Sequence, residues 1–149
     1  MTTPYLISDI KSDEGLRTKP YPDPLTGGAP WTVGYGHTGT DVAPGVSWPP
    51  GACERALAVD VGAVQRALDA ALPWWRTLND ARQDVLVNMG YNMGVAKLLT
   101  FKITLSNIQE GDYAQASVGM LQSLWASQVA SRARRLAKQM ETGERQCPT

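Results

Sequence analysis

Two carboxylates and one hydroxyl lie close together near the N-terminus, in a region rich in glycine and proline. Glu14 ends a polar, helix-like segment, Asp23 lies in a Pro-rich turn, and Thr32 belongs to a short alternating run. One protonated and one ionised carboxyl can cleave a glycosidic bond, because the first protonates the leaving oxygen while the second activates water or attacks the sugar. These residues are therefore the candidate catalytic set.

The sequence around this set is more specific than the carboxylates alone. With 14 Asp and Glu residues in 149, a pair nine positions apart arises easily by chance. The flanking residues form a Glu-Gly-Leu-Arg opening, a Tyr-Pro-Asp turn and a Thr-Val-Gly-Tyr-Gly-His run. This pattern resembles the catalytic segment of the bacteriophage lysozymes, the endolysins of glycoside hydrolase family 24. Further segments are similar to the helical half of that family, in the same order: 72–75, 88–94, 123–129 and 132–135.

The resemblance implies both a fold and an activity. The fold is α+β and mostly helical, with a small β-hairpin lobe and a helical lobe joined by a long helix. The activity is that of an N-acetylmuramidase, an inverting glycoside hydrolase that cuts the β-1,4 bond between N-acetylmuramic acid and N-acetylglucosamine in peptidoglycan. Glu14 would be the general acid, Asp23 the base or stabiliser, and Thr32 would help to hold the water.

The hairpin turn departs from the family pattern. Asp23 and Thr32 are separated by three more residues than in the most familiar members, and the extra length falls in residues 24–30. Without allowance for the extra residues, Thr26 would be the aligned threonine. Only Thr32, however, is followed by the Val-Gly-Tyr-Gly-His run. We therefore assign the catalytic hydroxyl to Thr32, and the proline and glycine content of the extra residues predicts a defined turn.

The resemblance also implies residues that contact the substrate. Thr38, Tyr91 and Thr104 match positions that contact the saccharide in the family. A further contact position, which holds an asparagine in the best-known member, is Gly119 in this chain. The substrate contacts of the family are thus only partly present. No metal and no cofactor are expected.

Three further residues match supporting positions of the family. His37, the single histidine, and Asp60 match a hydrogen-bonded pair, and Arg132 matches an arginine that reaches toward the acid. A lone histidine is more often structural than catalytic, so we expect His37 to tie the hairpin to the long helix. A carboxylate partner raises the pKa of a histidine above its ordinary value.

Length and the apolar pattern predict one domain over residues 1–149, and the resemblance implies that it is lysozyme-like. We expect a lobe with the hairpin at about 13–46, a connecting helix at about 49–72 and a helical lobe at about 73–149 that also includes the N-terminal helix. Within the helical lobe, caps and breakers predict helices from Asn79 to Gly94 and over 101–110, 113–124 and 129–142. Three tryptophans beside helix ends are expected in the core: Trp74, Trp75 and Trp125.

Composition restricts the partners. Lys and Arg together number 14, equal to Asp and Glu, so there is no overall positive charge to attract nucleic acid. No basic head precedes a long apolar run, and no stretch approaches the roughly 18 apolar residues of a membrane span. The resemblance to endolysins implies a monomer made in the host cytoplasm, without stable membrane association, that reaches the wall through a separate holin. Without a secretion signal, Cys53 and Cys147 are expected to be free thiols.

Two other functions remain open at this point. A lytic transglycosylase acts on the same bond through an intramolecular attack and needs essentially the glutamate alone, so the retained aspartate and threonine argue against it. A non-catalytic module could instead bind the wall or nucleic acid through the basic residues near the C-terminus. That alternative leaves the Glu-Asp-Thr set without a purpose, and loss of turbidity of chloroform-treated Gram-negative cells would exclude it.

Overall fold

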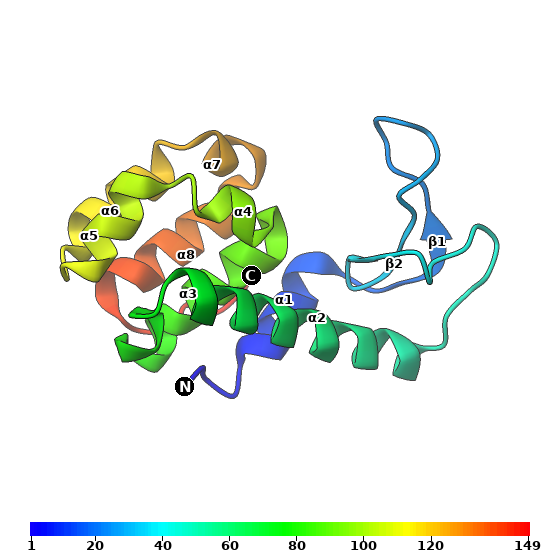
Figure 1. Cartoon of the computed structure of the whole chain (residues 1–149), viewed down its shortest axis with the longest axis horizontal. Helices are drawn as coiled ribbons and strands as arrows, with labels where there is room; N and C mark the ends of the chain where they lie inside the picture. The colour runs from blue at the N-terminus through cyan, green and yellow to red at the C-terminus, as the bar shows by residue number, and fades with distance from the viewer. The chain divides into compact units, whose positions relative to one another are not determined.

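The computed structural model describes residues 1–149 and is mostly helical, with one small antiparallel sheet (Figure 1). The expected α+β fold is confirmed. The sheet contains β1 (Arg17–Tyr21), β2 (Thr32–Gly34) and β3 (His37–Thr38), in that order. The helices are α1 (Leu6–Glu14), α2 (Pro50–Ala71), a 3-10 turn η1 (Trp75–Thr77), α3 (Asp80–Met93), α4 (Val95–Leu98), α5 (Lys102–Gln109), α6 (Tyr113–Leu121), α7 (Leu124–Gln128) and α8 (Ala130–Thr142).

The chain divides into two compact units. The smaller unit, Ile7–Gly62, holds most of α1, the sheet and the first part of α2. The larger unit combines Met1–Leu6 with Ala63–Thr149 and holds the remaining helices. Most of α1 therefore groups with the hairpin, whereas the sequence expectation assigns the N-terminal helix to the helical lobe.

The longest helix, α2, runs through the boundary between the two units. It begins at Pro50, where a missing backbone N–H costs nothing because the first turn of a helix has no acceptor for it. It ends at Ala71, two residues before Pro73, which agrees with the predicted range. None of the helices combines the length and the apolar character needed to cross a membrane.

In the smaller unit, the sheet packs closely on α2. Gly34 at the end of β2 has φ +71°, and a Cβ built on it would lie 3.1 Å from Cβ of Cys53. A larger residue would push the strand away from the helix. Glycine is therefore required here both by the positive φ and by the close approach to Cys53. The sheet covers a core in which Val33, Cys53 and Leu57 are almost completely buried.

In the larger unit, α6 packs against α5 and α8, and α8 also packs against α3 (Figure 1). The predicted cap of α3 is present, because the Asn79 side chain accepts a hydrogen bond from the backbone N–H of Arg82. Trp75 is fully buried and donates its indole N–H to Asp69. Trp125 is also buried and Trp74 is half-buried, so the tryptophans lie largely in the core as expected.

The helix predicted over 113–124 is wrong at its C-terminal end. The structure ends α6 at Leu121 and starts α7 at Leu124. The hydroxyl of Ser123 donates to the carbonyl of Met120 and accepts from the N–H of Ala126, so it closes one helix and caps the next. A serine that bonds the backbone in this way competes with helix continuation.

Candidate functional site

Glu14 is the last residue of α1, and its position is defined by the turn that follows. Gly15 adopts a left-handed conformation, φ +71°, and its N–H bonds the carbonyl of Lys11. This is a common way for a helix to end. Lys11 also forms an ion pair with Glu54 of α2 and places its ammonium 5.5 Å from the Tyr35 ring centroid. The glutamate thus lies at a helix end that the hairpin and α2 hold in place.

Asp23 organises the long turn between β1 and β2. Its carboxylate Oδ2 accepts a hydrogen bond from the N–H of Thr26 at 3.1 Å. Its backbone N–H bonds the carbonyl of Gly28, and its carbonyl accepts from the N–H of Gly27. Because both its main chain and its side chain are bonded within 24–28, the extra residues form a defined turn, as the sequence predicts.

Two threonines in this region have different environments. The hydroxyl of Thr26 donates to the carbonyl of Ala29 at 2.8 Å and accepts from the N–H of Gly28, so it is engaged inside the turn. Thr32 is half-buried in β2, where its Cα pairs with Tyr21 of β1. Asp23 lies two residues beyond Tyr21, so the aspartate and Thr32 occupy the same end of the hairpin. This geometry favours Thr32 over Thr26 as the site hydroxyl.

His37 pairs with Asp60, and this pairing confirms the sequence prediction. Nδ1 of the imidazole lies 2.7 Å from Oδ2 of Asp60, which joins β3 to α2. The second ring nitrogen, Nε2, lies 3.0 Å from Oδ1 of Asp41. Sequence analysis missed Asp41. The signal available in the sequence was the position of Asp41, four residues after the histidine, with Gly39 between them. In the structure, a Cβ on Gly39 would lie 2.5 Å from the Asp41 carboxylate, so a glycine leaves room for the contact.

The electrostatics of His37 follow from these two carboxylates. Burial alone would lower the pKa of His37, but the hydrogen bonds to Asp60 and then Asp41, with their charges, outweigh burial and raise the pKa above 6.5. A carboxylate at each ring nitrogen favours the doubly protonated ring, in which both nitrogens donate. The ring also packs against Trp48, with centroids 5.3 Å apart. His37 is thereby a structural tie and not a free base.

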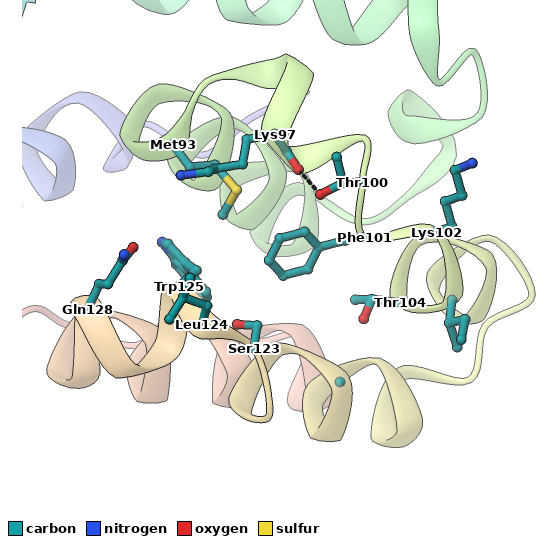
Figure 2. Close-up of a pocket in the computed structure, with 12 residues that line it drawn as sticks. Met93, Lys97, Thr100, Phe101, Lys102, Thr104, Ser123, Leu124, Trp125 and Gln128 are labelled. Carbon is teal, nitrogen blue, oxygen red and sulfur yellow. Dashed lines mark hydrogen bonds between the residues drawn. The ribbon is translucent and has the colours of Figure 1, made fainter.

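The larger unit contains a pocket of about 680 Å³ between α4, α5 and α7. Figure 2 shows Phe101 and Trp125 directed into it, with Thr104 and Ser123 at its side. The two aromatic rings meet edge to face, with centroids 6.5 Å apart. Gly119 also lines the pocket, and a Cβ there would lie 2.4 Å from Oγ1 of Thr104. The threonine hydroxyl therefore occupies space that a side chain at 119 would need.

The remaining predicted site residues of the larger unit lie on α3 and α8. Tyr91 is half-buried on α3. Nε of Arg132 on α8 donates to Oδ1 of the buried Asn88 at 2.8 Å, which ties these two helices together. Neither residue lines the pocket. The predicted site residues thus fall into two groups, Glu14, Asp23, Thr32, Thr38, His37 and Asp60 in the smaller unit and Tyr91, Thr104 and Arg132 in the larger.

Comparison with known proteins decides the family. The family described as "Phage lysozyme" matches residues 11–141, a range that contains every predicted site residue. The chain belongs to the phage lysozyme family. The match covers both the hairpin motif and the later segments that resemble the family, up to Glu141 in α8.

The relatives of this chain include proteins with different names and roles. "Probable T4-type lysozyme 1" of Dictyostelium discoideum is 36% identical over 46% of this chain and 41% of its own length. "Endolysin" of Bacillus phage B103 is 33% identical over 74% of the chain and 41% of its own length. "Pre-baseplate central spike protein Gp5" of Enterobacteria phage T4 is 30% identical over 90% of the chain but only 27% of its own length. The chain thus spans less than half the length of each of these relatives.

Proposed function

We propose that this phage lysozyme hydrolyses the β-1,4 bond between N-acetylmuramic acid and N-acetylglucosamine in peptidoglycan. The observation that carries the proposal is the hairpin, in which Asp23 and Thr32 lie at the same end of paired strands. Glu14 precedes them at a helix end held by the same unit. Names of family relatives, lysozyme and endolysin, support the same chemistry.

In this mechanism the three residues have separate tasks. Glu14 donates a proton to the leaving oxygen, and Asp23 activates a water on the opposite face of the sugar ring. The hydroxyl of Thr32 holds that water by a hydrogen bond. Because water attacks directly, the anomeric configuration inverts, and no glycosyl-enzyme bond forms.

The proposed substrate contacts are Thr38 in the smaller unit and Tyr91 and Thr104 in the larger unit. Thr38 on β3 pairs with Thr32 across the strands and contacts the saccharide beside the catalytic hydroxyl. The roles of Tyr91 and Thr104 follow from the family positions that they match. His37, Asp60 and Arg132 are positioning residues, since their hydrogen bonds hold the elements that carry the contacts.

In the cell, we place the enzyme in the host cytoplasm as a monomer that causes lysis once a separate holin permeabilises the membrane. The name endolysin among its relatives supports this role. The match to a spike protein favours a second setting, in which the same hydrolase acts as one part of a larger particle protein. Fractionation of infected cells separates the two, since an endolysin stays free of assembled particles.

Proton NMR of the first sugar released from purified glycan strands tests the reaction. Direct attack by water on a β-linked bond produces the α-anomer before mutarotation, and this is the expected signal. An early β-anomer would show that the configuration is retained and would indicate a covalent route instead of inversion. Release of an anhydro sugar without a new reducing end would make the enzyme a lytic transglycosylase.

A further inference from the structure

A second cavity lies in the smaller unit, beside the long turn and apart from the pocket of Figure 2. Its volume is about 550 Å³, within the range of about 300 to 1,000 Å³ that small ligands occupy. Seven residues line it: Ala29, Pro30, Trp31, Thr38, Gly39, Thr40 and Val42. None of them is charged, and they combine one large aromatic ring with two hydroxyls.

Both walls of this cavity are held by residues already described. Ala29, on the first wall, receives the hydrogen bond from Thr26, whose N–H is bonded to Asp23. The second wall, 39–42, is held by the bond between Asp41 and His37. Hydrogen bonds from Asp23 through Thr26 therefore hold one wall of the cavity, and the bond between His37 and Asp41 holds the other.

We infer that this cavity is an additional subsite for one sugar ring of a glycan strand, with Trp31 as the stacking platform. The inference rests on the proposed function, because Thr38 lines the cavity and is also the cross-strand partner of Thr32. A pyranose presents C–H groups on its face and hydroxyls at its edge. An indole with nearby threonine hydroxyls matches both, since aromatic side chains bury large area and the hydroxyls can donate or accept.

The lack of charge distinguishes this occupant from a peptide. The stem peptides of peptidoglycan carry carboxylates, and burying these against an uncharged wall without partners is costly. Burying a neutral N-acetylated sugar has no comparable desolvation cost. Trp31 is half-buried and Thr38 and Thr40 are exposed, so all three side chains are at least partly accessible to a ligand.

Binding is measured in the full chain carrying Glu14→Gln, so that the ligand is not cut. The probe is soluble glycan strands stripped of stem peptides, titrated by calorimetry. Trp31→Ala in this background should raise the Kd about tenfold, the loss expected for one removed stacking contact. Trp31→Phe should recover most of the affinity. The control is Leu25→Ala in the same turn, because Leu25 is 94% exposed and does not line the cavity.

An unchanged Kd for a folded Trp31→Ala variant overturns the subsite, as does an equal loss in the Leu25 control. If Trp31→Ala does not fold, Thr40→Val carries the test, since it keeps the shape and removes one hydroxyl; we expect about a fivefold weaker Kd, and no change overturns the subsite. Trp31-dependent binding of free stem peptide instead of glycan also overturns it. Cleavage of peptidoglycan by the parent chain is assayed alongside, so that loss of the proposed function is distinguished from loss of the subsite alone.

Discussion

Nδ1 of His37 lies 2.7 Å from Oδ2 of Asp60, and this pair joins the hairpin to the long helix within the smaller unit. The side chain of His37 is 14% exposed and that of Asp60 30%, so the pair is partly shielded from water. Asp41 contacts the other ring nitrogen. The hairpin carries Asp23 and Thr32, so a tie at its base helps to position the site.

This pair predicts a pH-dependent stability. The folded pKa of His37 is raised above 6.5, so its contribution is fully present below about pH 6.5 and is lost as the pH rises through the folded pKa. Asp60→Asn should therefore lower the free energy of unfolding by about 2 kcal/mol at pH 5, and by less at pH 9. Urea unfolding at both pH values measures this. Glu110→Gln, which changes an exposed carboxyl, is the control, and an equal loss from Asp60→Asn at both pH values would contradict the charged pair.

Gly34 should be among the least replaceable glycines. Gly34→Ala adds a Cβ at φ +71° and brings it within 3.1 Å of Cys53, so we expect a loss of about 2 to 3 kcal/mol. Gly45 has φ +78° but no neighbour within 4 Å, so Gly45→Ala should cost only about 1 kcal/mol of backbone strain. Thermal unfolding compares the two variants. Equal losses would mean that the contact with Cys53 does not matter.

The long turn allows a direct test of the site hydroxyl. Thr32→Ala should reduce turnover by about a hundredfold, since a positioned hydrogen bond to the attacking water is lost. Thr26→Ala removes bonds within the turn and should reduce turnover by less than about tenfold. Both are measured as kcat on purified peptidoglycan. A larger loss at Thr26 would show that the extra residues shift the hydroxyl role to the turn.

Glu14→Gln should be the most damaging single change. It keeps the shape of the side chain but cannot donate a proton, so activity should fall at least about a thousandfold. The neighbouring carboxyl provides the control, since Asp13→Asn should retain most of the activity. Clearing of chloroform-treated Gram-negative cells reports both. If Asp13→Asn were the inactive variant, the general acid would have been assigned one residue too late.

Elements with strong local signals could be predicted from the sequence. Repeated apolar positions and a proline at each end define α2, and Asn79 defines the start of α3 by its side-chain cap. The split between α6 and α7 could not be predicted, because the apolar pattern continues and one serine hydroxyl decides the boundary.

The site was predicted only in part, for a similar reason. The pairing of His37 with Asp60 followed from family resemblance, since 23 residues separate them and no periodicity connects them. Asp41 was missed because its contact depends on the missing side chain of Gly39. The crowding between Gly119 and Thr104 likewise depends on two helices that only the fold brings together.

Mass analysis of the muropeptides released from purified peptidoglycan tests the central claim most directly. The parent chain should release fragments that end in a reducing N-acetylmuramic acid, each heavier by one water than the anhydro form, and Glu14→Gln should release almost none. Fragments that end in reducing N-acetylglucosamine would place the cut at the other glycosidic bond, and an intact glycan would contradict the muramidase activity itself.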